Sequence, residues 1–147
     1  MATLAGIGAD VPFFASRAAA ARVEGIGERV TALPEHDLTV VLVHPDLRLR
    51  TGDVFRELRE EEWGSAMNDL LAPALRLCPP IADLFALVAA AGGEPRLTGS
   101  GPTVFAATDD PDRARGIASR LQRAGRTVTV TRSRPAGASI ARSTEEE

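Results

Sequence analysis

The run Leu38-Thr-Val-Val-Leu-Val-His44 constrains the fold of this chain more than any other stretch. It consists of β-branched residues and leucine between Asp37 and Pro45, and such a continuous apolar run predicts a strand that is buried on both faces. A strand of this kind belongs in the middle of a sheet. His44 closes the run, and we interpret it as a strand-end residue rather than as a ligand.

The stretches after this strand alternate between helical and extended patterns. We expect helices at 52–59, 66–77, 81–91 and 110–124, and strands at 96–98, 103–108 and 127–131. Thr51 is a plausible N-cap of the first helix, and Pro73 should kink or split the second. Asp110 and Gly125 mark the start and the end of the last helix. The order of elements predicts an α+β fold of the split βαβ or ferredoxin-like type, with extra helices inserted after its first strand.

Two local patterns refine this expectation. In the helix at 52–59, the residues Val54, Phe55 and Leu58 should form one apolar face. The charge run at 57–62 is expected to be a solvated helix end rather than a metal site, because its glutamates and its arginine share no common face for coordination.

The first third of the chain carries a different pattern. Residues 18–33 predict a β-hairpin that turns at Gly25-Ile-Gly27, and Met1–Ala5 resembles the end of a helix rather than its beginning. At the other end, 135–147 is rich in small residues and finishes in three glutamates, which predicts a disordered tail. The expected domains are therefore 1–36, 37–134 and this tail.

Composition excludes several classes of function. The 147 residues are 44% apolar and 25% charged, as in a soluble globular protein. A net charge of -3 argues against nucleic acid as a partner. No apolar stretch reaches the roughly 18 residues that a membrane span needs, and no signal peptide is recognisable, so we expect a cytoplasmic protein without a membrane partner. The single cysteine, Cys78, is interpreted as a structural residue at a helix end.

The stretch Gly6-Ile-Gly-Ala-Asp-Val-Pro-Phe-Phe14 presents one carboxylate, Asp10, between small residues and a stiff apolar run. The glycines allow a turn, Pro12 fixes its own φ, and the phenylalanines should anchor the far side in a core. This arrangement suits a reactive acid held at a fixed point. An ordinary helix N-cap would have the same sequence, so both interpretations stay open here.

A second motif is Leu97-Thr-Gly-Ser-Gly101, which leads through Pro102 into an apolar run. Consecutive backbone N–H groups and the hydroxyls of Thr98 and Ser100 could face one concavity there, which would suit a phosphate or a carboxylate. A glycine-serine turn between two strands is more often only a turn.

In this order the motifs resemble the GHMP kinase superfamily and, within it, the later half of the 4-diphosphocytidyl-2-C-methyl-D-erythritol kinase family of the non-mevalonate isoprenoid pathway. The resemblance runs from about Ala5 to about Val130. It rests on the blocks Gly8-Ala-Asp-Val-Pro-Phe-Phe14, Glu24-Gly-Ile-Gly-Glu28, Asn68-Asp-Leu70, Leu97-Thr-Gly-Ser-Gly101 and Thr103-Val-Phe105.

The resemblance implies a function and a set of site residues. It implies ATP-dependent phosphorylation of the 2-hydroxyl of a cytidine diphosphate sugar alcohol, with Asp10 as the catalytic base. Thr51, Thr98, Gly99, Ser100 and Gly101 would line the substrate and phosphate site. ATP and Mg²⁺ are implied as cofactors, the latter held by the nucleotide, and no metal ligand is assigned to this chain.

The resemblance also implies a missing part. The nucleotide-binding loop of the family and its N-terminal lysine lie upstream of the matched region, and this sequence has neither. Residues 1–36 would then be a remnant of the N-terminal kinase domain and 37–134 the C-terminal domain. We expect a C-terminal fragment whose partner is the missing N-terminal half. The alternatives are another GHMP kinase, such as a homoserine or mevalonate-type kinase, or a non-catalytic ligand-binding module of the same fold.

Overall fold

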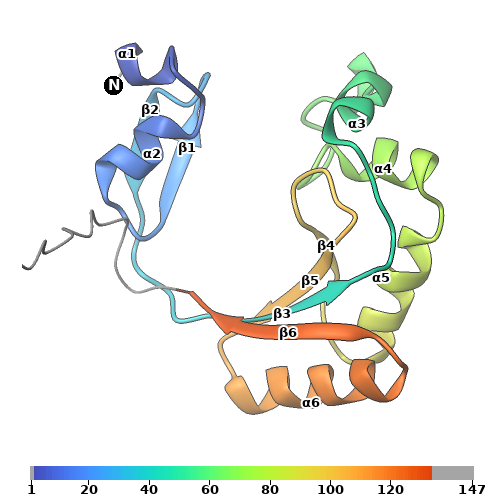
Figure 1. Ribbon diagram of the computed structural model, residues 1–147. Coiled ribbons are helices and arrows are strands. Elements are labelled where there is room, and N and C mark those ends of the chain that lie inside the picture. Colours follow the sequence, from blue (N-terminus) through green and yellow to red (C-terminus); the bar gives the residue numbers. More distant parts are fainter. Residues whose placement is uncertain (1, 134–147) are drawn as a thin grey trace, which may run out of the picture. The chain divides into compact units, whose positions relative to one another are not determined.

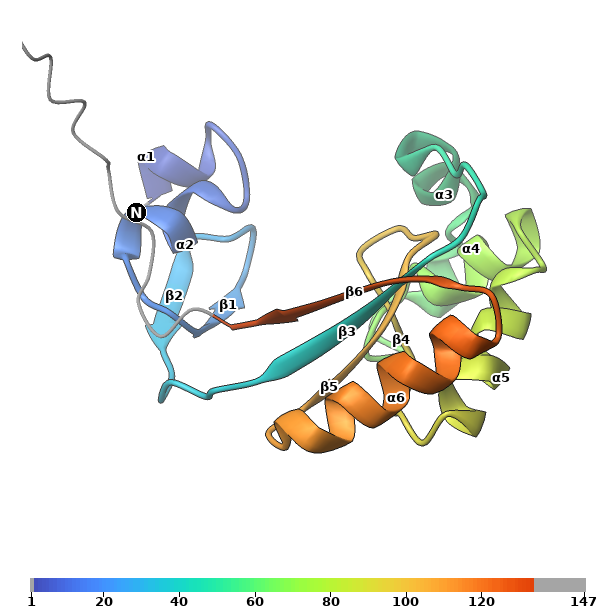
Figure 2. The same ribbon diagram turned by 60° about the horizontal axis from the view of Figure 1, so that its bottom comes forward.

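The computed structural model describes residues 2–133 (Figures 1 and 2). The predicted tail at 135–147 lies outside the described residues. The chain divides into two compact units, of which one comprises the residues up to Asp37 together with Ser133 and the other Leu38–Arg132.

The first unit contains two short helices and a hairpin. Its elements are α1 (Ala2–Ala5), α2 (Val11–Ser16), β1 (Ala21–Glu24) and β2 (Arg29–Ala32). The strands pair antiparallel, with Val23 opposite Val30, which confirms the predicted hairpin. Most side chains of these strands are exposed. Phe14 is also 59% exposed, so the expectation that both phenylalanines anchor this stretch in a core was wrong.

The turn of the hairpin approaches the backbone just before Asp10. Gly27 has a φ of +100°, and a Cβ placed there would lie 2.0 Å from the carbonyl oxygen of Ala9. Only glycine tolerates both that backbone conformation and that approach. The turn therefore packs directly against the residue that precedes Asp10, and Gly27 is required for this contact.

The second unit is a four-stranded antiparallel sheet with helices. Its elements are β3 (Thr39–His44), α3 (Thr51–Glu57), the 3₁₀ turn η1 (Glu60–Glu62), α4 (Leu71–Leu77), α5 (Ile81–Ala90), β4 (Arg96–Leu97), β5 (Val104–Thr108), α6 (Pro111–Arg123) and β6 (Thr127–Arg132). The strand order is β4-β5-β3-β6, and every neighbouring pair is antiparallel. This is the predicted split βαβ arrangement, with α3, η1 and α4 inserted before α5.

The strand β3 lies in the middle of this sheet, as its sequence predicts. Alternate residues Thr39, Val41 and Val43 are buried, and those between them are partly covered. The helices α5 and α6 pack against the sheet, and α6 runs along β3 and β6 (Figure 1). The core between sheet and helices includes Val41, Val43, Val54, Ile81, Leu84, Val88, Val104, Ile117 and Leu121.

The inserted helices differ from the sequence prediction in two respects. The helix expected at 66–77 begins only at Leu71, because the side chains of Asn68 and Asp69 bind backbone amides in the preceding turn and hold it in a non-helical form. In α3, Val54 is fully buried but Phe55 is 57% exposed. The predicted apolar face of that helix was therefore wrong at Phe55.

Two further features bear on the sequence predictions. In the described part of the chain, no individual helix has the length and apolar character to cross a membrane, although the bent pair α4 and α5 meets those two criteria jointly. The helix α6 begins as predicted, because the Asp110 carboxylate accepts hydrogen bonds from the amides of Asp112 and Arg113.

Candidate functional site

The glycine-rich turn after β4 is closed by hydrogen bonds of its own. The amide and the hydroxyl of Thr98 both donate to the carbonyl oxygen of Thr103, at 3.0 and 3.1 Å. The amide of Gly101 donates to the carbonyl oxygen of Thr98 at 2.7 Å. The Thr98 hydroxyl and the Gly101 amide are therefore engaged inside the turn, and they are less available to a ligand than the sequence suggested.

The tip of the turn is different. Across residues 2–133, the backbone amides of Gly99 and Ser100 have no acceptor. A Cβ on Gly99 would meet nothing within 4 Å, so this point of the backbone is open. Two consecutive free amides at an open backbone are the groups that bind an oxyanion in glycine-rich loops.

The backbone conformation at Gly101 explains why the second glycine of the turn stands at this position. Its φ is +81°, and a Cβ there would lie 2.9 Å from Cδ1 of Leu97. A side chain at this position would be strained and would press on a buried core residue.

The hydroxyl of Ser100 is hydrogen-bonded to the hydroxyl of Thr51 at 2.9 Å. Thr51 is the first residue of α3, whose N-cap position is occupied by Arg50. The interpretation of Thr51 as the cap was therefore wrong, and its hydroxyl is instead directed to the glycine-rich turn. This contact brings together two of the residues that the resemblance assigned to the site.

Asn68 also contacts this turn, which the sequence did not reveal. Its side-chain amide donates to the carbonyl oxygens of Gly99 at 2.8 Å and Leu97 at 3.3 Å. Its side-chain oxygen accepts a hydrogen bond from the amide of Leu70 at 3.0 Å. Asn68 thus connects the start of α4 with the turn.

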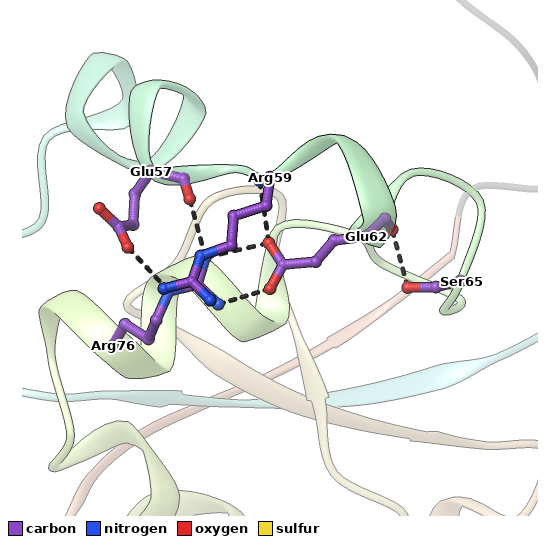
Figure 3. Close-up of polar contacts among 5 residues, drawn as sticks. All are labelled: Glu57, Arg59, Glu62, Ser65 and Arg76. Carbon is purple, nitrogen blue, oxygen red and sulfur yellow. Dashed lines mark hydrogen bonds and ion pairs between the residues drawn. The ribbon is translucent and has the colours of Figure 1, made fainter.

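A cluster of ion pairs joins the segments between α3 and α4 (Figure 3). Arg76 of α4 donates to the Glu57 carboxylate at 2.8 Å and to the Glu57 carbonyl oxygen at 2.7 Å. It also donates to both carboxylate oxygens of Glu62, at 2.5 and 2.9 Å. Arg76 therefore joins the end of α3, the 3₁₀ turn and α4.

The ion pairs of this cluster shift the pKa values of Glu62 and Arg76. Hydrogen bonds from Arg76, and then from the backbone amide of Arg59, lower the pKa of Glu62 to about 2. The same contacts raise the pKa of Arg76, first through Glu62 and then through Glu57. The Glu62 side chain is only 16% exposed. The expectation of a solvated charge run was wrong for Glu57 and Glu62, since both contact Arg76.

Asp10 belongs to the first unit. It occupies the N-cap position of α2, but its backbone is helical and its carboxylate accepts no cap hydrogen bond. The side chain is exposed and has no hydrogen-bond partner in the described part of the chain. The structure therefore gives the Asp10 carboxylate no capping role, and the group is accessible from solvent.

A pocket of about 730 Å³ lies beside the turn. It is lined by Ala66, Met67, Asn68, Leu71, Phe85, Glu94, Pro95, Arg96, Leu97, Thr98, Gly99 and Phe105. Its walls are largely apolar, and Glu94 and Arg96 form an ion pair at 3.1 Å within its lining.

The remaining candidates are a metal site, Cys78 and His44. The described residues contain no group of three His, Cys, Asp or Glu side chains able to hold a metal ion. Cys78 is buried at the end of α4. His44 is exposed at the end of β3, where its Nε2 lies 3.1 Å from the hydroxyl oxygen of Thr129.

Known proteins are similar to this chain in sequence and in fold. Residues 53–127 match the model of the GHMP kinases C-terminal family. The chain is 36% identical over 138 residues to a 4-diphosphocytidyl-2-C-methyl-D-erythritol kinase of Granulibacter bethesdensis, covering 79% of this chain and 45% of the relative. A kinase of the same name from Thermus thermophilus is 34% identical over 140 residues, covering 82% of this chain and 50% of the relative.

Solved structures agree with the sequence matches. A crystal structure of 4-(cytidine 5'-diphospho)-2C-methyl-D-erythritol kinase aligns with a TM-score of 0.69 at 30% identity, covering 91% of this chain and 55% of that one. A homoserine kinase from Cytophaga hutchinsonii aligns with a TM-score of 0.52 at 20% identity, covering 74% and 45%, which shows a shared fold.

The chain spans about half the length of the curated relatives that it matches. The family match covers the inserted helices, the glycine-rich turn and α6 of the second unit. The chain therefore belongs to the GHMP kinase family, and its second unit corresponds to the C-terminal domain of that family.

Proposed function

We propose that this chain is the C-terminal part of an ATP-dependent kinase that phosphorylates the 2-hydroxyl of 4-diphosphocytidyl-2-C-methyl-D-erythritol. The observation that carries the proposal is the tip of the glycine-rich turn. The amides of Gly99 and Ser100 have no acceptor within residues 2–133, and they are presented by a turn that is otherwise internally bonded. Similarity to the named kinases supports this choice of substrate.

The chemistry divides between binding and proton transfer. The Gly99 and Ser100 amides would bind phosphate oxygens of the bound reactants, and the hydroxyls of Thr51 and Ser100 would contribute further donors. The Asp10 carboxylate would accept the proton of the attacking hydroxyl as its oxygen forms a bond to the γ-phosphorus and the bond from that phosphorus to the leaving ADP breaks. In this scheme Thr98 and Gly101 shape the turn rather than bind the ligand.

ATP and Mg²⁺ enter this scheme from the family. The free amides fit a phosphate group, whereas the described carboxylates form no metal cluster. Mg²⁺ would therefore be carried by the nucleotide, where it neutralises phosphate charge. The nucleotide loop would come from an N-terminal half like that of the longer relatives, which would make such a half the required partner.

A calorimetric titration set beside a turnover assay tests the proposal. The protein is this chain joined to the N-terminal half of the Thermus thermophilus relative, titrated with ATP and with the cytidine diphosphate substrate. We expect binding of both ligands and ATP-dependent turnover. Binding without turnover, in a preparation that is folded and monodisperse, would favour the non-catalytic module and contradict the proposal.

Homoserine kinase remains the alternative within the family. The structural likeness to the Cytophaga hutchinsonii protein, at 20% identity, concerns the fold alone. It gives no independent reason to choose homoserine as the substrate. We therefore expect no turnover of homoserine or mevalonate by the joined protein.

A further inference from the structure

The side-chain amide of Asn68 acts on a peptide group that belongs to the open tip of the turn. The carbonyl oxygen of Gly99, which accepts a hydrogen bond from Asn68 at 2.8 Å, shares one planar peptide group with the N–H of Ser100. In a trans peptide, the C=O and N–H bonds point in opposite directions. Fixing the Gly99 carbonyl toward Asn68 therefore directs the Ser100 N–H away from it.

No other hydrogen bond in the described part of the chain fixes this peptide group. The bonds between Thr98, Gly101 and Thr103 close the base of the turn and leave the Gly99 carbonyl untouched. Gly99 itself has a φ of +50° and open space where a Cβ would be, so its own side of the backbone provides no steric restraint. Within residues 2–133, Asn68 is thus the one side chain that is hydrogen-bonded directly to this peptide group.

Asn68 is itself held in one orientation. Its side-chain oxygen accepts from the Leu70 amide at 3.0 Å, which leaves the NH₂ group to face the carbonyl oxygens of Leu97 and Gly99. The reverse orientation would place oxygen against two carbonyl oxygens and NH₂ against an amide donor, so it is excluded. The start of α4 thereby fixes the direction from which Asn68 donates.

We infer that Asn68 is a positioning residue of the anion site, because its side-chain amide orients the Ser100 N–H for binding to a phosphate oxygen. The inference rests on the proposed function for the identity of the ligand. The orientation of the N–H bond is a separate property of the free protein. The two can therefore be tested separately.

The decisive variant is Asn68→Ser. A serine hydroxyl can still accept the Leu70 amide two residues ahead, but it is too short to donate to Gly99, and it adds no charge near the anion. The matched control is Gln122→Ser, which also replaces a side-chain amide by a hydroxyl. Gln122 is exposed on α6, and its side chain makes no hydrogen bond within residues 2–133.

Two measurements are made on each protein. The residual dipolar coupling of the Ser100 N–H reports the direction of that bond without any ligand. A titration with inorganic phosphate, followed by the amide signals of Gly99 and Ser100, reports affinity. We expect Asn68→Ser to change the coupling and to weaken phosphate binding by about tenfold, the typical loss for a hydrogen bond to a charged group. Gln122→Ser should leave both within about twofold.

Each outcome decides a separate claim. An unchanged Ser100 coupling in Asn68→Ser would overturn the positioning role, whatever the phosphate affinity. If the unmodified chain shows no phosphate-induced shift at either amide, the proposed anion site fails while the coupling still decides the role of Asn68. If Asn68→Ser does not fold, the coupling is measured in Asn68→Asp, which keeps the acceptor for Leu70 and lacks the donor; an unchanged coupling there would equally overturn the inference.

Discussion

The hydroxyl of Thr51 is hydrogen-bonded to the hydroxyl of Ser100 at 2.9 Å, although the two residues are 49 positions apart in the sequence. This contact connects the first turn of α3 to the tip of the glycine-rich turn. The hydroxyl of the first residue of α3 therefore contacts the turn and does not cap its own helix.

Replacing Thr51 by valine should loosen this turn. Valine keeps the shape of threonine but removes the hydroxyl, and an exposed neutral hydrogen bond contributes about 0.5 kcal/mol. We expect hydrogen exchange at the Gly101 amide, which is bonded to Thr98, to become about two- to threefold faster. Thr51→Ser keeps the hydroxyl and is the control. Equal exchange rates in the valine and serine variants would show that the hydroxyl contact has no such effect.

Asp10→Asn should separate catalysis from folding. The Asp10 side chain is exposed and accepts no cap hydrogen bond, so the isosteric amide should leave the thermal midpoint unchanged. In the chain joined to an N-terminal half, loss of a general base should lower kcat by about 10²- to 10⁴-fold with little change in KM. An unchanged kcat would remove Asp10 from the mechanism.

The contact between Glu62 and Arg76 predicts a specific pH dependence of stability. The pKa of Glu62 is lowered from 4.5 to about 2 in the folded chain, so its carboxylate stabilises the fold above about pH 4.5 and loses this effect as the pH falls toward 2. The urea midpoint of the unmodified chain should therefore exceed that of Glu62→Gln at neutral pH, and the difference should shrink over this window.

Glu60→Gln is the control for this experiment. Glu60 lies in the same 3₁₀ turn, and its side chain is exposed and makes no hydrogen bond to any residue of 2–133. Its replacement should change the urea midpoint little, and by the same amount at each pH. A difference between Glu62→Gln and the unmodified chain that stays constant from neutral pH to pH 3 would contradict the assigned contact.

Gly27→Ala should disturb the segment that carries Asp10. A Cβ at this position would meet the Ala9 carbonyl oxygen at 2.0 Å on a backbone of positive φ, and strain of this kind costs about 1–3 kcal/mol. We expect faster hydrogen exchange across β1 and β2. Gly8→Ala is the matched control, because its Cβ would lie an ordinary 3.5 Å from Val11. The same exchange rates in both variants would argue against the close approach.

The parts of the fold that follow from local chemistry could be predicted from the sequence. The central strand β3 was evident from its unbroken apolar run, and α6 from the Asp110 cap and the glycine after its end. These signals depend on neighbours along the chain. The order of elements was then sufficient for the split βαβ topology.

The candidate site depends on contacts between distant residues, which a single sequence does not contain. The contact of Thr51 with Ser100, the contact of Asn68 with Gly99 and the pairing of Arg76 with Glu62 all join separate elements. In the sequence, Asn68 stands just before α4. The carbonyl oxygens to which its side chain donates lie about 30 positions further along the chain, and nothing in the local sequence pattern indicates these contacts.

Turnover against a panel of alcohols tests the central claim most directly. The chain joined to the N-terminal half of the Thermus thermophilus relative is incubated with ATP and Mg²⁺ and with 4-diphosphocytidyl-2-C-methyl-D-erythritol, homoserine or mevalonate, and the products are identified by mass. We predict a product that carries one added phosphoryl group only with the cytidine diphosphate substrate, and its loss in Asp10→Asn. Phosphorylation of homoserine or mevalonate instead, or equal turnover by Asp10→Asn, would contradict the account.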